Sequence, residues 1–408
     1  MKLLLLLTHS FPYDSGEEFL AAELDCVSGF DRVVVCPCCL TEHSVRTRPL
    51  PDGIGCFPFV RTELERTAYA GLLFSPPVLR EIGSLAGAGR FSAGRLHELL
   101  YFMKNAAEIR RALSKLPELS QADEVLIYSY WFYDTAAAGA LLADELKKQG
   151  LRTALISRAH GFDIHEDRRK YGYLPMRKVL FSRADRLFPC SEDGAAALRE
   201  QSPENARKIE TEYLGTRDCG VKYGDRKELH VVSCSYMVEV NRLHRIIQAL
   251  KEADFPVRWT HIGTGPLREE LMGLASSLPP NVTAEFPGQM DNAAVMEYYS
   301  SQDISVFTNV SSSEGISVSI MEACSFGLPV VATDVGGTAE IVSDGGNGFL
   351  LPADFGPEQF LEKLRKLSGM SGEEYARLCE NSRRVWEEKF DAARNYREFY
   401  EKIGGELP

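Results

Sequence analysis

The sequence predicts an α/β protein built from two Rossmann-like domains, and three observations lead to this prediction. The chain has 408 residues, which is long for one hydrophobic core and suits two. Short apolar runs typical of buried strands alternate with helical stretches along most of the chain. A glycine-containing stretch without clear periodicity, at 214–227, separates the two halves.

Each expected strand is a short apolar run, and in most cases a helical stretch precedes the next one. This order produces parallel sheets with helices on both faces. The expected strands are Leu3–Thr8, Arg32–Cys36, Glu124–Ser129, Thr153–Ala159 and Arg186–Pro189, followed by His230–Cys234, Arg258–Ile262, Val282–Phe286, Ile304–Thr308 and Pro329–Thr333.

The chain opens on five consecutive leucines, Leu3–Leu7, which could belong to a signal peptide. The run is too short for one, lacks a small-residue cleavage site and is soon followed by His9 and Pro12. We interpret it as the first buried strand of a parallel sheet and expect a cytoplasmic protein. No later run approaches the length of a membrane span.

The composition is that of a globular protein, with 44% hydrophobic and 25% charged residues. The net charge of -12 argues against nucleic acid as a partner. The ten cysteines are widely scattered and are expected to be reduced thiols. Cys36 and Cys39, with Cys38 and His43 nearby, could bind zinc, but one C-x-x-C pair without a second is a poor predictor of zinc. We therefore expect no metal site.

Residues 60–120 combine the apolar runs Gly71–Leu79 and Leu99–Met103 with several interleaved arginines. The favoured interpretation is a set of helices that cover the first sheet with their apolar faces. The alternative is a helical surface that lies on a membrane, in which case a lipid-linked acceptor would bind here.

Glu314 and Glu322 mark the clearest site signal of the sequence. The small residues Ser311–Ser313 precede Glu314, so we expect a loop with accessible backbone amides and then a helix. Eight residues on a helix are a little over two turns, which would place both carboxylates on one face. A helix N-terminus suits a phosphate, and carboxylates accept hydrogen bonds from sugar hydroxyls. The segment is therefore expected to bind a nucleotide diphosphate sugar.

The two glutamates are followed by Ser325–Thr333, read Ser-Phe-Gly-Leu-Pro-Val-Val-Ala-Thr, and by the Gly-Gly turn of Gly336–Val342. Together these motifs resemble the retaining glycosyltransferases of family 4. The resemblance covers most of the chain, is strongest from 228 to 352, and is closest to bacterial transferases of polysaccharide and lipopolysaccharide biosynthesis.

The resemblance implies the GT-B fold, in which two Rossmann-like domains face a cleft and the C-terminal helix crosses back to the first domain. We expect the acceptor-side domain to comprise residues 1–215 with a helix at about 388–408. The domain that binds the nucleotide sugar would comprise residues 216–387. The segment 381–403 is expected to be helical throughout.

The resemblance also assigns roles to residues of the motifs. Glu314 would be catalytic at the transferred sugar, and Glu322 would bind the ribose hydroxyls. His160 follows a strand and would be the second catalytic residue, because its ring can donate a hydrogen bond to a diphosphate or a sugar hydroxyl. The other implied donor-binding residues are Gly315, Ile316 and Ser317 through their amides, Gly16, Gly263, Gly288 and Gln289.

One departure from the family pattern follows the strand His230–Cys234. Family members carry an arginine and a lysine there, and both charges stabilise the leaving diphosphate. In this chain Tyr236 and Asn241 stand at those places. Arg242 is adjacent and is the expected substitute, so Asn241 and Arg242 are both included in the donor site.

The sequence therefore predicts a retaining glycosyltransferase, with a UDP-sugar expected ahead of a GDP-sugar as donor. The acceptor would be a glycan or a lipid-linked sugar in cell-surface polysaccharide assembly, with peripheral contact at the inner membrane face left open. The chain contains no Asp-x-Asp pair, so we expect metal-independent transfer without a cofactor. The alternative is a non-catalytic glycosyltransferase-like partner or scaffold subunit, which Tyr236 and Asn241 favour. A nucleotide-sugar epimerase would need an acid/base set that the sequence does not show.

Overall fold

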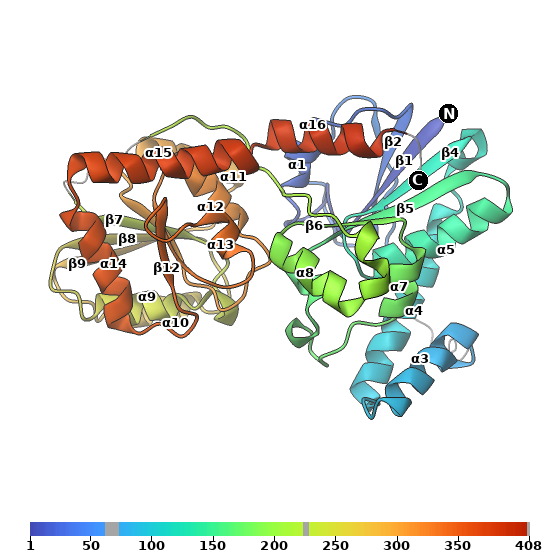
Figure 1. Cartoon of the computed structure of the whole chain (residues 1–408), viewed down its shortest axis with the longest axis horizontal. Helices are drawn as coiled ribbons and strands as arrows, with labels where there is room; N and C mark the ends of the chain where they lie inside the picture. The colour runs from blue at the N-terminus through green and yellow to red at the C-terminus, as the bar shows by residue number, and fades with distance from the viewer. Residues whose placement is uncertain (62–72, 223–227, 406–408) are drawn as a thin grey trace. The chain divides into compact units, whose positions relative to one another are not determined.

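The computed structural model describes residues 1–61, 73–222 and 228–405, and the chain forms two compact units (Figure 1). The first unit comprises Met1–Glu212 and Tyr396–Pro408, and the second comprises Tyr213–Asn395. Each unit contains one six-stranded sheet in which all paired strands are parallel. The prediction of two α/β units is therefore confirmed.

The sheet of the first unit has the strand order β3-β2-β1-β4-β5-β6. Its strands are β1 (Lys2–Thr8), β2 (Arg32–Pro37), β3 (Ile54–Cys56), β4 (Glu124–Ser129), β5 (Arg152–Ala159) and β6 (Arg186–Pro189). The leucine run forms the central strand β1, where Leu3, Leu5 and Leu7 pack in one hydrophobic cluster and Leu4 and Leu6 in another. Because alternate side chains of a strand point to opposite faces, the unbroken apolar run is explained by burial of both faces.

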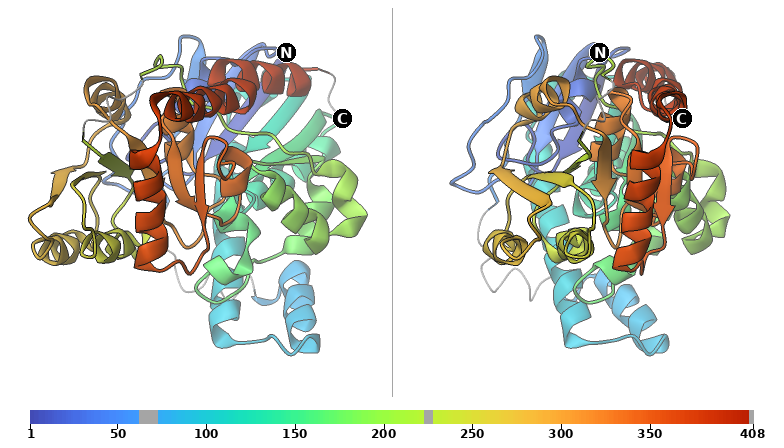
Figure 2. Two further views of the ribbon diagram at one scale, coloured as in Figure 1. Left: turned by 60° about the vertical axis from the view of Figure 1, so that its left-hand side comes forward. Right: turned by 90° about the vertical axis from the view of Figure 1, so that its left-hand side faces the viewer.

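The helices of the first unit cover both faces of this sheet. They are α1 (Leu20–Leu24), α3 (Pro76–Gly87), α4 (Ala93–Leu113), α5 (Asp134–Lys148), α6 (Gly161–Ile164), α7 (Arg177–Arg183), α8 (Glu192–Gln201) and most of α16 (Ala392–Ile403), with 3₁₀ turns at Pro117–Gln121, Glu166–Arg168 and Pro203–Lys208. The α3–α4 pair extends beyond the end of the sheet (Figure 2).

The apolar runs predicted to cover the first sheet are only partly buried. In α4, Leu99 and Phe102 are buried as expected, whereas Tyr101 faces solvent. Phe74 and Leu79 are exposed, at 79% and 51%. Gly71 and Leu72 lie outside the described residues.

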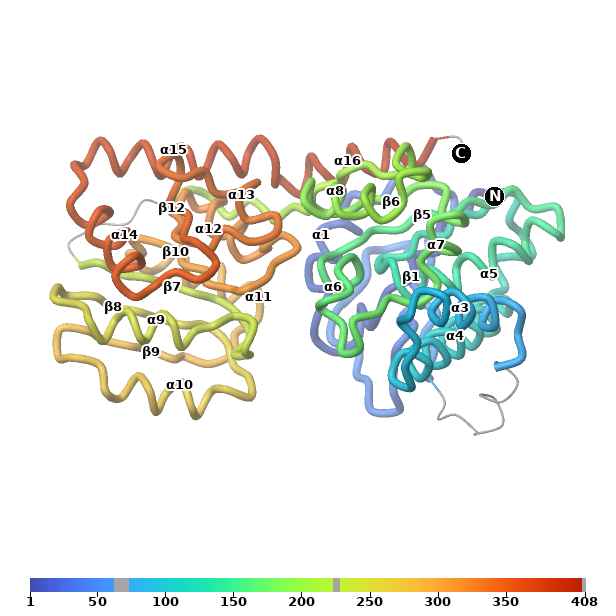
Figure 3. The backbone as a smooth tube through the Cα atoms, turned by 60° about the horizontal axis from the view of Figure 1, so that its bottom comes forward, coloured from blue at the N-terminus to red at the C-terminus, as the bar shows by residue number. Residues whose placement is uncertain are grey.

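The sheet of the second unit has the order β12-β11-β10-β7-β8-β9. Its strands are β7 (His230–Cys234), β8 (Val257–Ile262), β9 (Val282–Gly288), β10 (Val306–Asn309), β11 (Val330–Thr333) and β12 (Gly348–Leu351). Its helices are α9 (Leu243–Leu250), α10 (Arg268–Ala275), α11 (Asn292–Ser301), α12 (Val318–Ser325), α13 (Thr338–Ile341), α14 (Pro357–Gly369) and α15 (Gly372–Lys389), with a 3₁₀ turn at Glu239–Asn241. Figure 3 shows α9 beside α10 and α14, and α12 beside α15.

All ten predicted strands are present with small shifts at their ends, and two further strands, β3 and β12, complete the sheets. The segment 381–403, expected to be helical, is helical except at Phe390 and Asp391. The chain leaves the helical conformation at Phe390, whose φ of -127° ends α15, and α16 begins at Ala392.

Two properties of the described residues bear on the expectations about metals and membranes. Nowhere in residues 1–61, 73–222 and 228–405 do three His, Cys, Asp or Glu side chains gather as a metal site would require. In the same ranges, every helix falls short of the length or the apolar character needed to cross a membrane.

Candidate active site

The loop between β10 and α12 carries Glu314. β10 ends at Asn309 and α12 begins at Val318 with Ser317 as its N-cap, so Glu314 lies in the loop and Glu322 lies on the helix. The expected loop before the helix is therefore present and carries Glu314, but the two helical turns counted between Glu314 and Glu322 are not, because α12 begins only at Val318. Serine and glycine are poor helix formers, and α12 begins only where the chain becomes apolar.

Asn309, the last residue of β10, organises this loop. Its Nδ2 donates to Oε1 of Glu314 at 3.1 Å and to Oγ of Ser317 at 3.1 Å. Its Oδ1 accepts from the backbone N–H of Ser311 at 3.0 Å. One side chain thus holds both ends of the loop and the Glu314 carboxylate. The sequence analysis did not identify Asn309, although a polar residue at the end of a buried strand was a usable signal.

The Gly-Gly turn after β11 supports the same loop from its carbonyl side. A Cβ at Gly336 would lie 2.0 Å from the carbonyl oxygen of Glu314, so only glycine fits there. Gly337 N–H donates to the carbonyl of Gly315 at 2.9 Å. By contrast, no described residue accepts a hydrogen bond from the backbone N–H groups of residues 315–317. These three consecutive amides are available to an anionic ligand.

Glu322 lies half-buried on α12, and its Oε1 accepts from Nδ2 of Asn292, the first residue of α11, at 2.6 Å. Burial first, and then the charge of Glu322, raise the pKa of Cys234 to about 12. Asn292 opens α11 shortly after the end of β9 at Gly288, so its contact with Glu322 places the carboxylate near the carboxyl ends of the strands. Glu322 therefore lies at the carboxyl edge of the sheet, where open parallel sheets bind ligands.

Arg242 is held by backbone carbonyls. Its Nε donates to Val310 O at 2.9 Å, its Nη2 donates to Ser311 O at 2.9 Å, and its Nη1 donates to the carbonyl of Ala353. Its backbone has a φ of +46°, in the left-handed region. Burial lowers the pKa of the Arg242 guanidinium from its usual value. The group therefore ties together the loops that follow β10 and β12.

Asn241, at the place of the family lysine, is also engaged within the protein. Its Nδ2 donates to Tyr236 O at 2.6 Å, and its Oδ1 accepts from Oγ of Ser311 at 3.2 Å. The Tyr236 side chain is 59% exposed. The site thus has polar contacts within the protein at the two places where family members carry an arginine and a lysine.

The predicted glycines after β8 and β9 meet at the same edge of the sheet. Gly263 N–H donates to Gly288 O at 2.9 Å. Gly263 has a φ of +145°, and a Cβ there would lie 2.0 Å from Ser235 O, so glycine is required for this approach. Gln289, next to Gly288, is exposed. The structure therefore brings the loops after β7, β8 and β9 together.

His160 lies in the first unit, between β5 and α6. Its ring is buried, and burial with the charge of Arg158 lowers its pKa to about 3, so the imidazole is neutral at pH 7. Nε2 lies 3.1 Å from Tyr130 O. Because a carbonyl can only accept, Nε2 carries the proton and Nδ1 is the acceptor. The ring therefore offers a ligand an acceptor, where the sequence analysis expected a donor.

Asp163 fixes the backbone around His160. Its Oδ1 accepts from the backbone N–H of His160 at 2.5 Å, and its Oδ2 accepts from the N–H of Phe132 at 2.6 Å. Burial raises the pKa of Asp163 to about 6, and Arg177 offsets part of that rise. This carboxyl joins the loops that follow β4 and β5.

Gly16, predicted to approach a phosphate, is exposed and has a φ of +94°. The amides of the preceding turn, at residues 9–11, all donate to the carboxylate of Glu17. Neither Asp14 nor Ser15 caps the following helix, because α1 begins at Leu20 with Phe19 as its N-cap. Asp14 instead accepts from Ser44 and Val45.

The fold is shared with solved glycosyltransferase structures. Anabaena Alr3699/HepE, crystallised with UDP and glucose, superposes with a TM-score of 0.68 over 99% of both chains at 17% identity. Sucrose-phosphate synthase from Thermosynechococcus elongatus superposes with a TM-score of 0.69 over 99% of both chains at 15% identity. The chain has the GT-B fold. At this level of identity the likeness concerns the fold alone.

Within this GT-B fold, residues 222–385 match the family model described as Glycosyl transferases group 1. The "Putative colanic acid biosynthesis glycosyltransferase WcaL" of Escherichia coli is 26% identical over 61% of this chain and 64% of its own length. The Salmonella typhimurium protein of the same name is 29% identical over 52% of this chain and 54% of its own length. The matches thus span less than two thirds of these relatives. The second unit carries a Glycosyl transferases group 1 domain.

Proposed function

We propose that this protein is a retaining glycosyltransferase of family 4 that uses a UDP-sugar, ahead of a GDP-sugar, as donor. The acceptor is a glycan or a lipid-linked sugar in cell-surface polysaccharide assembly. The observation that carries the proposal is the loop 310–317, where three backbone amides without an acceptor among the described residues accompany Glu314 at the carboxyl edge of the second sheet. The relatives named for colanic acid biosynthesis and the UDP-bound structural neighbour support it.

In the proposed complex each group acts through chemistry that its geometry permits. The amides of residues 315–317 donate to diphosphate or sugar oxygens, and Glu322 accepts from the ribose hydroxyls. Glu314 accepts from a hydroxyl of the transferred sugar. Nδ1 of His160, the acceptor atom of its neutral ring, accepts from another sugar hydroxyl. Gly263, Gly288 and Gln289 line the side of the base.

Retention is proposed to follow a front-face displacement, because no carboxylate has been identified as a covalent nucleophile. The bond between the anomeric carbon and the diphosphate oxygen breaks, and the acceptor oxygen bonds to the same face of that carbon. The leaving phosphate oxygen takes the acceptor proton, so charge and atoms balance. The role of the protein is to orient both substrates and to stabilise the diphosphate with amides.

The second candidate is a non-catalytic glycosyltransferase-like subunit, and the contacts of Arg242 favour it. Three carbonyls accept from its guanidinium, so its charge is partly used within the protein. Asn241 supplies only a neutral donor. Under this alternative the chain binds a partner enzyme or a glycan and turns over no donor.

A two-stage assay separates these candidates. Thermal shift with a panel of UDP-, GDP- and ADP-sugars identifies the donor, because a ligand that binds the native state raises the melting temperature. The slow hydrolysis of that donor is then measured as the release of nucleoside diphosphate together with the intact sugar. Donor binding with release of nucleoside diphosphate supports the transferase. Donor binding without that release, whichever acceptor is added, supports the subunit. A chain that binds none of the donors contradicts the transferase and supports a subunit that binds a partner enzyme or a glycan.

Glu322→Ala is expected to weaken binding of the nucleoside diphosphate by about one to two orders of magnitude. Two ribose hydroxyls would lose their acceptor, which corresponds to about 1–3 kcal/mol for unpaired polar groups. Isothermal titration measures the change in Kd. Glu297→Ala, which removes an exposed carboxylate from the neighbouring helix α11, is the matched control. Equal affinity in both variants contradicts the ribose role.

Turnover is expected to survive chelation by EDTA. Backbone amides take the place of a divalent cation at the diphosphate in this proposal. The measurement compares initial rates with EDTA, without it, and after addition of Mn²⁺. A complete loss that Mn²⁺ restores would show that the site depends on a metal.

A further inference from the structure

The turn after β1 directs three consecutive backbone amides at one carboxylate of the chain itself. Oε1 of Glu17 accepts from the N–H of His9 at 2.9 Å, and Oε2 accepts from the N–H groups of Ser10 and Phe11 at 2.8 Å each. Successive amides that converge in this way form a site for an anion. Here the anion is the side chain of Glu17, which follows these three residues by six to eight positions.

Glu17 is built into this site. The residue is only 5% exposed, although an unpaired carboxylate would be costly to bury. Its φ is +56°, a conformation that is unfavourable for a non-glycine residue and persists only where contacts enforce it. Its neighbour Glu18 is exposed and instead accepts from Gly16 N–H at 2.7 Å. The two adjacent carboxylates thus have different environments.

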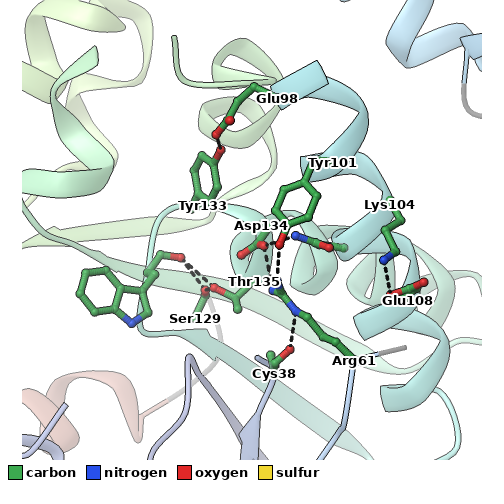
Figure 4. A network of polar contacts seen from close by, with 12 residues as sticks. Cys38, Arg61, Glu98, Tyr101, Lys104, Glu108, Ser129, Tyr133, Asp134 and Thr135 are labelled. Atoms are coloured by element: carbon green, nitrogen blue, oxygen red, sulfur yellow. Dashed lines mark hydrogen bonds and ion pairs between the residues drawn. The ribbon is translucent and has the colours of Figure 1, made fainter. Parts of the chain in front are cut away.

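The Glu17 carboxylate also reaches the loop after β4. Nε1 of Trp131 donates to its Oε1 at 2.6 Å. The carbonyl of Trp131 accepts from Oγ of Ser129 at 2.7 Å and from Oγ1 of Thr135 at 3.2 Å, both labelled in Figure 4. Trp131 is therefore held at its backbone by its own loop and at its indole by Glu17.

Trp131 in turn packs on His160, with ring centroids 4.6 Å apart. The preceding residue, Tyr130, has its ring 5.2 Å from His160, and its carbonyl accepts from Nε2 of His160. Phe19, two residues after Glu17, stacks on Tyr130 at 5.5 Å. The surroundings of the His160 ring are thus built from the two segments that Glu17 joins.

We propose that Glu17 is a positioning residue: it fills the anion site of the turn after β1 and, through Trp131, fixes the orientation of His160. The positioning part rests on the proposed function, because it assumes that His160 contacts the transferred sugar. The anion-site part does not. A consequence is that residues 9–11 hold no donor phosphate while Glu17 is in place.

The experiment replaces the carboxylate and then supplies it from solution. In Glu17→Ala three amides and one indole N–H lose their acceptor, so the full-length variant is expected to melt several degrees below the parent. Sodium formate, compared with sodium chloride at equal ionic strength, is expected to raise its melting temperature and to restore donor hydrolysis. The parent and Glu18→Gln, the matched control with the same charge removed, are expected to show no such response to formate.

Glu17→Gln keeps the shape of the side chain and keeps the anion site filled. One oxygen can still accept, but the amide nitrogen faces N–H donors. We expect a smaller loss of stability than in Glu17→Ala, no response to formate, about a tenfold loss of kcat and an unchanged Kd for the nucleoside diphosphate, which binds the second unit. This variant decides the matter if Glu17→Ala is insoluble with and without formate.

The outcomes separate the two proposals. Equal effects of formate on the melting temperatures of Glu17→Ala, Glu18→Gln and the parent would overturn the anion site. Parental kcat in Glu17→Gln would overturn the positioning role. If the parent itself hydrolyses no donor, the proposed function fails together with the positioning role, while the response of the Glu17→Ala melting temperature to formate still tests the anion site.

Discussion

Glu314→Gln is expected to lower kcat by about a hundredfold, a loss typical of removing one group that stabilises the reacting centre. The proposed partner of Glu314 is the transferred sugar, on which positive charge develops as the bond to the diphosphate breaks. A carboxylate interacts with that charge more strongly than a neutral amide does, and the difference grows in the transition state. The Kd for the nucleoside diphosphate is expected to change little.

Glutamine is the informative replacement because it preserves the loop. Its Oε1 can still accept the hydrogen bond that Asn309 now donates to Glu314 at 3.1 Å. Single-turnover rates and nucleotide titrations on the same samples separate chemistry from binding. Glu314→Gln and Glu322→Ala should then show opposite profiles, the first in kcat and the second in Kd. If Glu314→Gln keeps the parental kcat, Glu314 is a residue of the loop without a catalytic role.

Arg158→Met is expected to destabilise the protein by about 3–5 kcal/mol, the cost of leaving one partner of a buried ion pair uncompensated. Arg158 and Glu23 are both fully buried in the first unit, with Nε of Arg158 3.6 Å from Oε2 of Glu23. Nε of Arg158 also donates to the Tyr128 hydroxyl at 2.7 Å, and its guanidinium lies 4.5 Å from the ring centre of Phe399. Burial raises the pKa of Glu23, and Arg158 offsets part of that rise.

The measurement is equilibrium unfolding in urea, with the melting temperature as a second readout. Arg365→Ala is the control, because Arg365 forms ion pairs with Asp254 and Glu358 at the surface and its loss should leave the melting temperature unchanged. Replacing Arg158 and Glu23 together by Met and Leu should recover part of the loss, since no charge is then left unpaired. If Arg158→Met has the same melting temperature as the parent, the buried pair does not stabilise the first unit.

Most of the strands that the sequence predicted are buried on both faces, such as β1, whose leucines alternate between two clusters. The two that it missed, β3 and β12, lie at the edges of their sheets and span only three and four residues. Each of these two segments contains a glycine, which is unfavourable in strands and weakens the signal of so short a segment. Their pairing depends on the neighbouring strand, which local sequence does not reveal.

In the candidate site, too, the features that local sequence shows were predicted and those that depend on distant residues were not. Glu314, Glu322 and the Gly-Gly turn are close in sequence, so their motif could be read directly. The bond between Glu17 and Trp131 joins residues 114 positions apart and left no local signal. The contacts of Arg242 depend on a left-handed backbone and on carbonyls from loops 68 to 111 positions away. Sequence alone therefore suggested that Arg242 is a cation available to the diphosphate, whereas in the structure its guanidinium donates to backbone carbonyls and joins two loops.

The first unit is discontinuous in sequence, and this determines the order in which the chain can complete its folding during synthesis. Phe399, Tyr400 and Ile403 belong to the same hydrophobic cluster as Leu4 and Leu6 of the first strand. That cluster lacks these side chains until residues 399–403 have been translated, whereas every residue of the second unit has been made by Asn395. The second unit can therefore finish folding first, and the nascent N-terminal unit is the part that requires protection from aggregation.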